Sequence, residues 1–251
     1  MGSPERARIL VDDDTRVLVV TGAGISAESG LATFRGAGGL WEGNRVEDVA
    51  TPEGFAADPA LVWRFYSARR AAALTSRPNP AHLALAVLER RIGDRFLLVT
   101  QNVDGLHRRA GSERLIEIHG SLFRTRCSRC DRAPFADETL HEADLPACDR
   151  CAMWGRHAYL RPDIVWFGEL LDSGHLHRVE SFAVDRPGRR LVFIAVGTSG
   201  NVWPVAGFVD LAAAAGGETW LVNLDPVPNG WRFDRVVRGP AGEVLPSLLG
   251  V

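Results

Sequence analysis

The stretch VLVVTGAGISAESG, residues 17–30, decides the fold of this chain of 251 residues. It opens with a continuous apolar run, which is typical of a strand buried on both faces of a sheet. The run ends in GAGISA, residues 22–27, which has the G-x-G-x-x-A spacing of a dinucleotide-binding turn. Gly22 permits the tight turn, and Gly24 lets backbone amides approach a pyrophosphate at the N-terminus of the next helix. Glycine-rich strand–helix turns are common, so the meaning of this one depends on the strands that accompany it.

Short apolar runs with polar C-terminal ends recur along the chain, and helical patterns lie between them. The clearest helical patterns are AHLALAVLERRI (81–92), introduced by PNP, and VAGFVDLAAAAGG (205–217), closed by two glycines. Strands that alternate with helices predict an α/β fold with a doubly wound, parallel, Rossmann-like sheet. The further strand candidates are FLLVTQN (96–102), LIEIHG (115–120), LVFIAVGTSG (191–200) and TWLVNLD (219–225).

The polar tails of these runs, TGAG, TQN, HG, GTS and NLD, all follow predicted strands at their carboxyl ends. Ligands of such sheets bind beyond those ends, so the tails predict one shared site. A dehydrogenase of this fold would add a second strand ending in Asp or Glu about 20 residues after the turn. That window is TFRGAGGLWEGNR, residues 33–45, where Glu42 is present but no strand is indicated. We therefore expect a nucleotide bound in a way unlike that of hydride-transfer enzymes.

The four cysteines form two C-x-x-C pairs, and their pattern C-x2-C-x17-C-x2-C is that of a zinc ribbon. Two such pairs place four thiolates around one tetrahedral zinc, and this closed shell leaves no position for a reacting water. Two disulfides or a redox pair are the alternatives; a cytosolic setting disfavours disulfides, and a redox motif needs only one pair. We therefore predict one structural Zn²⁺, held by Cys127, Cys130, Cys148 and Cys151.

Composition points to an ordinary globular protein, with 46% hydrophobic and 24% charged residues. A net charge of −2, and the acidic stretch DETLHEADLP between the cysteine pairs, argue against direct nucleic-acid binding. No apolar run approaches the roughly 20 residues that span a bilayer, and the polar N-terminus lacks a signal-peptide pattern. These features predict a cytoplasmic protein without membrane contact. All 29 basic residues are arginines, so the chain offers no lysine of its own for acylation.

Seven motifs occur in a fixed order and carry a family resemblance. They are GAGISAESGLATFRG, TQNVDGLH, an isolated IHG, the cysteine pairs, LRPDIVWFGE, GTSGNVWP and NLDP. In this combination the chain resembles the sirtuins, which are NAD-dependent protein-lysine deacylases, over about residues 16–250. The resemblance implies NAD as a consumed co-substrate and acylated-lysine proteins or peptides as partners.

Two regions of the chain break the alternation of strands and helices, which predicts a division into two domains. Residues 1–42, 80–120 and 162–251 would form the NAD-binding Rossmann-like domain. Residues 43–79 and 121–161, a helical excursion and the zinc ribbon, would form a smaller lobe.

Site residues are carried over from the family motif by motif. His119 corresponds to the catalytic base, with Asn102 as a second catalytic residue. Residues 165–168 correspond to the segment that clamps the substrate peptide and the acyl-lysine; they are Val165, Trp166, Phe167 and Gly168. The cofactor contacts would be Gly22, Ala23, Gly24, Ala27, Thr33, Phe34, Arg35, Trp41, Gln101, Asn102, Val103, Asp104, Gly197, Thr198, Ser199, Asn223, Leu224, Asp225 and Ala241. Asp225 departs from the family, where Glu is common, and its reach is shorter by one methylene.

In the chemistry that the resemblance implies, the acyl-lysine carbonyl oxygen attacks the ribose carbon that bears nicotinamide, and nicotinamide leaves as that carbon–nitrogen bond breaks. His119 then accepts a proton from a ribose hydroxyl, and water releases lysine and O-acyl-ADP-ribose. An imidazole suits this step because its usual pKa, about 6.5, lies near neutrality. Asn102 and Asp104 have an alternative role as turn formers. The remaining histidines are expected to be structural: His82, His107, His141, His157, His175 and His177.

Tyr66 and Arg69, in WRFYSARR (63–70), stand three residues apart and share a face if the segment is helical. This pair resembles the branch of sirtuins that removes succinyl and malonyl groups as well as acetyl. A guanidinium can bind the carboxylate of a succinyl-lysine with a bidentate fork, and a phenol can add a donor. The alternative is a solvated helix face with two adjacent arginines. An NAD hydrolase or ADP-ribosyltransferase is the alternative function.

Overall fold

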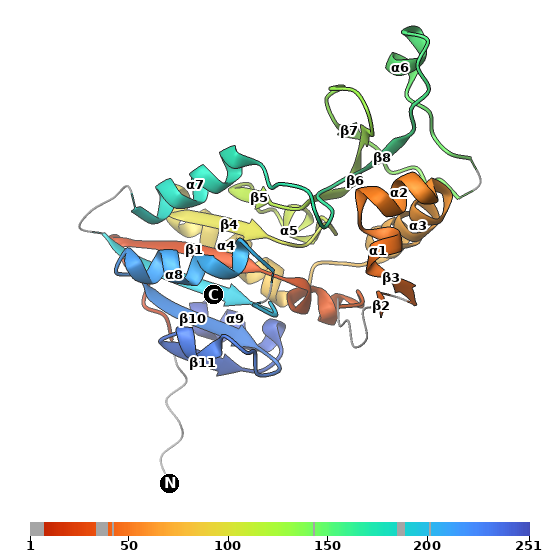
Figure 1. Ribbon diagram of the computed structural model, residues 1–251. Coiled ribbons are helices and arrows are strands. Elements are labelled where there is room, and N and C mark those ends of the chain that lie inside the picture. The colour runs from red at the N-terminus through yellow and green to blue at the C-terminus, as the bar shows by residue number, and fades with distance from the viewer. Residues whose placement is uncertain (1–7, 34–39, 42, 143, 185–188, 201) are drawn as a thin grey trace.

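The computed structural model describes residues 8–33, 40–41, 43–142, 144–184, 189–200 and 202–251. Its main element is a six-stranded sheet in the order β11-β10-β9-β1-β4-β5, and every neighbouring pair is parallel (Figure 1). The strands are β1 (Thr15–Thr21), β4 (Phe96–Thr100), β5 (Leu115–Glu117), β9 (Arg190–Val196), β10 (Glu218–Asn223) and β11 (Arg235–Arg238). This arrangement confirms the predicted parallel sheet.

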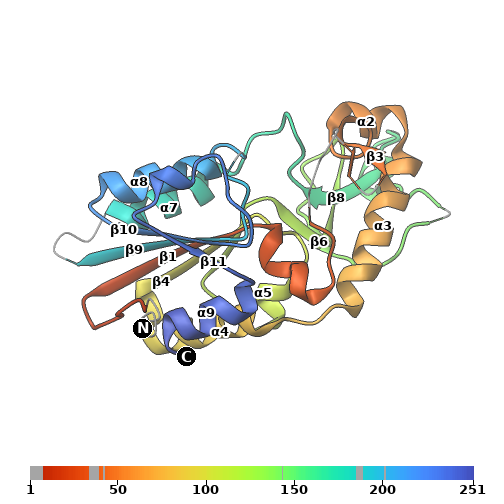
Figure 2. The ribbon, with the colours of Figure 1, turned by 90° about the horizontal axis from the view of Figure 1, so that it is seen from below.

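Helices cover both faces of this sheet, as a doubly wound fold requires (Figure 2). Alternate side chains of β1 point to opposite faces. Val17 and Val19 belong to the core under α4 (Pro80–Ile92) and α9 (Ala241–Leu249). Leu18 and Val20 belong to the core under α7 (Ser173–Val184) and α8 (Phe208–Ala214). Because both faces of β1 are buried, its sequence reads as a continuous apolar run.

The structure differs from the sequence prediction in three places. The glycine turn leads into a 3-10 helix, η1 (Ala23–Ser29), and not into a long α-helix. The predicted helix at 205–217 begins as the 3-10 turn η3 (Val205–Gly207) before α8. The edge strand β11 was not predicted, because its sequence RVVR has charged ends and only two apolar residues.

A smaller lobe combines the helical excursion with the cysteine segment (Figure 1). Its helices are α1 (Val46–Val49), α2 (Pro52–Ala57), α3 (Pro59–Thr75) and α6 (Asp149–Met153). Its antiparallel sheet has the order β7-β6-β8, formed by Phe135–Ala136, Gly120–Cys127 and Leu160–Ile164. Residues of α3, β6, β8 and three of the cysteines share one apolar core. The predicted lobe is therefore confirmed, whereas its boundaries stay a prediction.

The remaining elements are short and connect these layers. The described part of window 33–45 contributes β2 (Leu40–Trp41) and β3 (Asn44–Arg45), which pair with each other in a separate two-stranded sheet. The others are η2 (Gly93–Arg95), α5 (Leu106–Arg109) and η4 (Gly230–Arg232).

Three helices begin with the same local signal, a capping side chain followed by proline. Thr51, Asp58 and Asn79 each accept a hydrogen bond from the first turn of α2, α3 and α4, respectively. A short polar side chain satisfies amides that have no partner inside the helix, and proline at the next position has no amide to satisfy. These caps set where α3 and α4 enter the two lobes. Among the residues described, no helix is long and apolar enough to cross a membrane.

Candidate active site

The loops that follow β1 and β9 pack backbone against backbone at the carboxyl edge of the sheet. The Gly22 amide donates to the Val196 carbonyl at 2.9 Å, and the Gly24 amide donates to the Gly197 carbonyl at 2.8 Å. A Cβ atom at Gly24 would lie 2.7 Å from Cα of Gly197, and one at Gly22 would lie 2.8 Å from the Gly197 oxygen. The glycines are therefore required by contact between two loops. The amides of Gly22 and Gly24 are both used in this loop contact, and the approach of a pyrophosphate to the loop stays a prediction.

One buried hydroxyl, that of Ser26, joins two polar side chains of the loop after β4. Asn102 Nδ2 donates to Ser26 Oγ and to the Gly22 carbonyl, both at 3.1 Å. Ser26 Oγ in turn donates to Asp104 Oδ2 at 2.7 Å, while Asp104 Oδ1 accepts from the Leu106 amide at 2.9 Å. Burial raises the pKa of Asp104, and these hydrogen bonds oppose the rise. Asp104 thus forms the turn expected of its residue type and also holds the glycine loop.

His119 follows β5 and is held on both sides by backbone contacts. Its Nδ1 lies 3.1 Å from the Gln101 carbonyl oxygen. Because a carbonyl only accepts, Nδ1 carries the proton and Nε2 is the basic nitrogen of the neutral ring. The Val165 amide donates to the His119 carbonyl at 2.9 Å. Burial lowers the pKa of His119, and the hydrogen bond to Gln101 opposes this, so the ring is a neutral base near pH 7.

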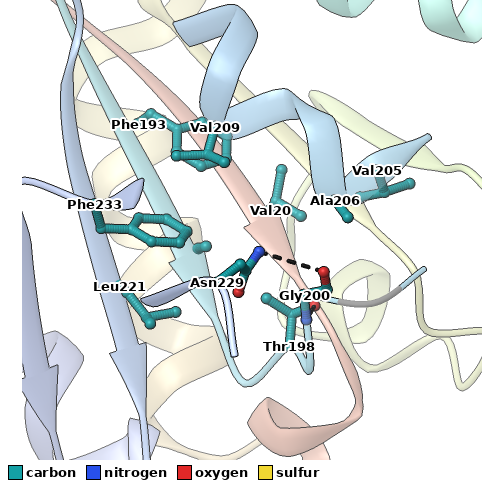
Figure 3. A pocket seen from close by; sticks show the side chains of 11 residues that line it. Val20, Phe193, Thr198, Gly200, Val205, Ala206, Val209, Leu221, Asn229 and Phe233 are labelled. Carbon is teal, nitrogen blue, oxygen red and sulfur yellow. Dashed lines mark hydrogen bonds between the residues drawn. The ribbon is translucent and has the colours of Figure 1, made fainter. Parts of the chain in front are cut away.

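Thr198 connects the loops after β4, β9 and β10. Gln101 Nε2 donates to Thr198 Oγ1 at 3.1 Å, and Asn223 Nδ2 donates to the Thr198 carbonyl at 3.3 Å. Asn229 Nδ2 donates to the Gly200 carbonyl at 3.3 Å and so holds the end of this loop (Figure 3). Under the loop lies a small cavity whose apolar lining includes Val20, Phe193, Val209, Leu221 and Phe233.

Residues 165–168 bridge the two lobes. The Phe167 amide donates to the Ala50 carbonyl at 3.0 Å, and the Val165 amide contacts His119 as described above. Between them Trp166 is buried, and its indole N–H donates to Tyr66 Oη at 3.0 Å. Gly168 has a φ of +87°, a conformation that favours glycine. The segment therefore ties the base-bearing loop to the small lobe.

Helix α3 carries Tyr66 and Arg69, as the sequence predicted, but Tyr66 is buried and does not lie on a solvated face. Burial raises the pKa of Tyr66 to about 12, while the Trp166 hydrogen bond and the Arg69 charge oppose the rise. Since the phenol oxygen accepts the indole N–H, its own hydrogen remains for donation. The Arg69 guanidinium lies 4.2 Å from the centre of the Trp41 ring. The Arg69 charge also acts to lower the pKa of Asp104, so its electrostatic effect extends from the small lobe to the Rossmann-like domain.

The four cysteine sulfurs lie within 4.8 Å of one another and form no disulfide. The Sγ atoms of Cys127 and Cys151 are 3.7 Å apart, and those of Cys130 and Cys148 are 3.8 Å apart. Sulfurs around a tetrahedral zinc with Zn–S bonds of about 2.3 Å are separated by about 3.8 Å. The donor set therefore fits one structural zinc, as predicted from the spacing.

Two buried histidines, His82 and His107, lie behind the glycine loop with ring centres 4.7 Å apart. His107 Nε2 is 2.9 Å from Thr21 Oγ1, and His82 Nδ1 accepts from the Asn79 amide at 3.3 Å. Burial lowers the pKa of His82 to about 4. Burial, followed by the effect of His82, lowers the pKa of His107 well below its usual value. Both rings are therefore neutral at physiological pH.

The structure brings most of the predicted site residues to one edge of the sheet. The contacts above join Gly22, Gly24, Gln101, Asn102, Asp104, Gly197, Thr198 and Asn223 with His119. Ala23 and Ala27 lie on η1, and Val103 is buried where its carbonyl accepts from the Leu122 amide. Ser199, Leu224 and Asp225 are exposed in the loops after β9 and β10.

Three predicted cofactor residues lie in other surroundings. Ala241 begins α9, where the next amide donates to Glu28 Oε2 of η1 at 2.7 Å. Thr33 is half-buried outside any helix or strand. Trp41 packs in the small lobe, with its ring centre 5.2 Å from that of Phe65. Phe34 and Arg35 fall outside the described residues.

Sequence reasoning missed three side chains that hold the site. Ser26 stands inside GAGISA, but only the fold reveals that its hydroxyl joins Asn102 to Asp104. Arg161 lies 3.4 Å from the centre of the Trp166 ring and pairs with Glu169 at 2.6 Å. Arg161 and Glu169 lie near the two ends of the segment LRPDIVWFGE (160–169), so this pair of opposite charges was the available signal.

A comparison with protein families matches residues 22–204 to the Sir2 family. The chain belongs to the Sir2 family. This Sir2 protein is 48% identical over 241 residues to an NAD-dependent protein deacylase of Salmonella typhimurium, covering 94% of this chain and 84% of the relative. It is 44% identical over 237 residues to an NAD-dependent protein deacylase of Pyrococcus furiosus, covering 92% of this chain and 91% of the relative.

Solved Sir2 structures share the fold over nearly the whole chain. A complex of a Sir2 homolog with NAD has a TM-score of 0.82 and 41% identity, covering 92% of this chain and 87% of that chain. A Sir2 protein bound to an acetylated peptide has a TM-score of 0.76 and 29% identity, covering 92% and 90%.

Replacing Cys151 by serine removes one of four thiolates, and we expect this Sir2 protein to lose its zinc and the small lobe to lose stability. Structural zinc contributes directly to folding, and serine is a poor replacement for a thiolate. Metal content by inductively coupled plasma mass spectrometry should fall from about one zinc per chain to well below one. Ser128→Ala, in the same C-x-x-C loop, should keep the metal. Full zinc content in Cys151→Ser would contradict the assignment.

Acidification should destabilise this Sir2 protein through its buried histidine pair. The folded protein keeps His82 neutral down to a pKa of about 4, whereas the unfolded chain binds the proton near the usual value. The unfolded state therefore binds more protons in this window. The contribution of the neutral His82 ring to the free energy of unfolding is fully present above about pH 6.5 and is lost as pH falls toward 4. Denaturant unfolding measured from pH 7 to 5 should show that the free energy of unfolding falls steeply with pH in the parent and less steeply in His82→Gln. The exposed His177→Gln should keep the parental slope, and an unchanged slope in His82→Gln would refute this origin.

Proposed function

We propose that this Sir2 protein is an NAD-dependent protein-lysine deacylase with His119 as its base. The observation that carries this function is the single tautomer imposed on His119, which leaves Nε2 basic beside the loop of Gln101 and Asn102. The products are free lysine, nicotinamide and O-acyl-ADP-ribose, and one NAD and one water are consumed for each acyl group removed.

The polar groups at the sheet edge fit NAD. Amide and hydroxyl groups of Gln101, Asn102, Thr198 and Asn223 lie in loops joined by hydrogen bonds, so they form one surface for a ribose and a pyrophosphate. When bound there, NAD supplies an electrophilic ribose carbon and a leaving group. The further cofactor contacts predicted from the family, including Asp225 and Ala241, belong to this proposal.

The chain's own residues position the reactants and move one proton. Residues 165–168 hold the acylated peptide, because they join His119 to the small lobe. An amide oxygen is a weak nucleophile, so this positioning supplies much of the rate. His119 Nε2 then accepts a proton from a ribose hydroxyl, and the Gln101 carbonyl stabilises the imidazolium that forms. Ser26 keeps Asn102 and Asp104 in place before substrate arrives.

We further propose that the enzyme accepts acidic acyl groups, succinyl and malonyl, in addition to acetyl. A carboxylate buried beside an apolar channel must have its charge paired. Arg69 provides the charge, and Tyr66 provides a hydroxyl that stays protonated because burial raises its pKa to about 12. Hydrogen bonds to charged groups are worth about 1.5–3 kcal/mol each, enough to select one acyl class.

The second candidate function is an NAD hydrolase or ADP-ribosyltransferase, because either could use the same pocket. The tie between residues 165–168 and His119 favours the deacylase, since it couples a peptide-sized surface to the base. The cytoplasmic location and the absence of direct nucleic-acid binding stay predictions from composition.

Incubation with NAD and an acetylated peptide should release nicotinamide and deacetylated peptide in equal amounts, as measured by mass spectrometry. His119→Ala should lower this rate by about 100-fold or more, because general base catalysis is worth that factor. The exposed His177→Ala serves as the control. Nicotinamide release that is independent of the peptide would favour the NAD hydrolase instead.

Arg69→Met should lower kcat/KM for a succinylated peptide by about 10-fold or more while sparing the acetylated peptide. Acetyl-lysine has no carboxylate and gains nothing from the guanidinium. Parallel assays on acetyl-, malonyl- and succinyl-lysine peptides of one sequence would measure this, with the exposed Arg64→Met on the same helix as control. An equal loss of all three activities would reject the role of Arg69 in acyl selection.

A further inference from the structure

Arg70, the neighbour of Arg69, is a buried arginine with 1% of its surface exposed. Its Nε donates to the Leu122 carbonyl at 2.7 Å. One terminal nitrogen donates to the Thr139 carbonyl and lies 3.3 Å from Asp137 Oδ2, and the other donates to Thr125 Oγ1 at 3.4 Å. One side chain of α3 therefore holds three separate points of the ribbon segment.

The acceptor Leu122 places this contact close to the proposed chemistry. It lies on β6, three residues after His119, and its amide donates to the Val103 carbonyl at 2.9 Å. Val103 stands between Asn102 and Asp104. A continuous chain of two hydrogen bonds therefore runs from α3 through β6 to the loop that bears the predicted nicotinamide contacts.

A second connection leaves α3 one turn earlier. Tyr66 accepts from the Trp166 indole at 3.0 Å, and the neighbouring Val165 amide donates to the His119 carbonyl at 2.9 Å. Tyr66 and Arg70 are four residues apart, so both connections leave one face of the helix. Helix α3 is thus attached to β6 at Leu122 and to the 165–168 segment at Trp166, and Arg69 lies between the two attaching residues of the helix in sequence.

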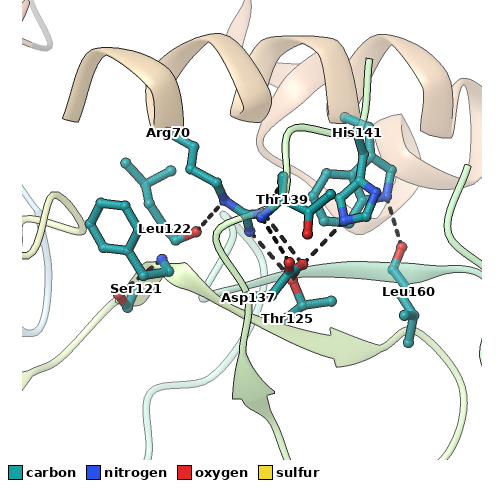
Figure 4. A network of polar contacts seen from close by, with 10 residues as sticks. Arg70, Ser121, Leu122, Thr125, Asp137, Thr139, His141 and Leu160 are labelled. Atoms are coloured by element: carbon teal, nitrogen blue, oxygen red, sulfur yellow. Dashed lines mark hydrogen bonds and ion pairs between the residues drawn. The ribbon is translucent and has the colours of Figure 1, made fainter. Parts of the chain in front are cut away.

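The partner carboxylate keeps Arg70 in this position. Asp137 Oδ2 also accepts from Thr125 Oγ1 at 2.6 Å and lies 3.1 Å from His141 Nε2 (Figure 4). Burial opposes ionisation of Asp137, but hydrogen bonds from Thr125, the Thr139 amide and His141 outweigh it and hold its pKa well below the usual range. Arg70 and Asp137 are therefore both ionised, and the hydrogen-bond geometry of this pair restrains rotation of α3 about its axis and its sliding along β6.

We propose that Arg70 is a positioning residue for acyl selectivity, which sets the distance between the Arg69 guanidinium and His119 through its bond to the Leu122 carbonyl. The inference rests on the proposed function, in which Arg69 binds the carboxylate of an acidic acyl group. A succinyl chain spans a fixed length between its amide and its carboxylate. Displacement of α3 therefore impairs succinyl and malonyl substrates much more than acetyl substrates.

Arg70→Lys tests this positioning directly. The ammonium keeps a charge for Asp137, but a single point donor cannot also reproduce the planar fork that reaches Leu122, Thr139 and Thr125. We expect kcat/KM for the succinylated peptide to fall by about 10-fold or more, mainly through KM, while the acetylated peptide changes by less than about threefold. Arg64→Lys, exposed on the same helix, should leave the ratio of the two activities unchanged.

A second variant guards against loss of folding. Arg70→Met combined with Asp137→Asn removes both charges of the buried pair together, so no lone charge is left inside the lobe. Zinc content and circular dichroism report whether the lobe is intact, and the same change in activity ratio is expected. An equal loss of both activities in these folded variants would show that Arg70 only holds the lobe together, and would overturn the inference.

The same assays separate this inference from the proposed acyl preference. If the parent enzyme has no desuccinylase activity, or if Arg69→Met leaves the ratio of desuccinylase to deacetylase activity unchanged, the proposed acyl preference is wrong. The proposed role of Arg70 is then wrong as well. A parent that desuccinylates and is sensitive to Arg69→Met, but whose ratio is unchanged in both Arg70 variants, defeats only the role of Arg70.

Discussion

The site depends on the close approach of two loop backbones, those of Gly22–Gly24 and Gly197. With a Cβ at Gly24 only 2.7 Å from the Gly197 Cα, any side chain there would push the loops after β1 and β9 apart. Their contact brings Thr198 within reach of Gln101 and brings the Gly22 carbonyl within reach of Asn102. Small residues at this edge of the sheet thus determine where the polar side chains meet.

Buried hydrogen bonds then hold those side chains without help from a ligand. Ser26 satisfies Asn102 and Asp104 together, and the Gln101 carbonyl sets the tautomer of His119. Polar groups that are fixed and dry before substrate arrives need little reorganisation during the reaction. Burial also raises the pKa of Asp104 and lowers that of His119, so the same desolvation that strengthens the network supplies a neutral base.

Sequence patterns were sufficient for features that depend on local chemistry. Apolar runs identified β1, β4, β5, β9 and β10 because both faces of these strands are buried, and the cysteine spacing identified the metal cluster. Sequence patterns did not predict features that depend on tertiary contacts. RVVR gave no signal for β11, which lies at the sheet edge, and the roles of Ser26 and Arg70 depend on partners distant in sequence. The glycine turn was located correctly, but its packing against Gly197 could not be predicted, because the loop after β9 lies far away in sequence.

Helix α3 carries a packing arginine next to the arginine that we propose for substrate recognition. Consecutive residues of an α-helix point about 100° apart, so Arg69 and Arg70 cannot face the same surroundings. Arg70 enters the lobe core and pairs with Asp137, while Arg69 packs on Trp41 and is only half-buried. Two adjacent arginines on a helix read as a solvated face in sequence. In the proposed function Arg70 stabilises the position of the helix and Arg69 selects the acyl group, so a displacement of Arg70 would move Arg69 with it.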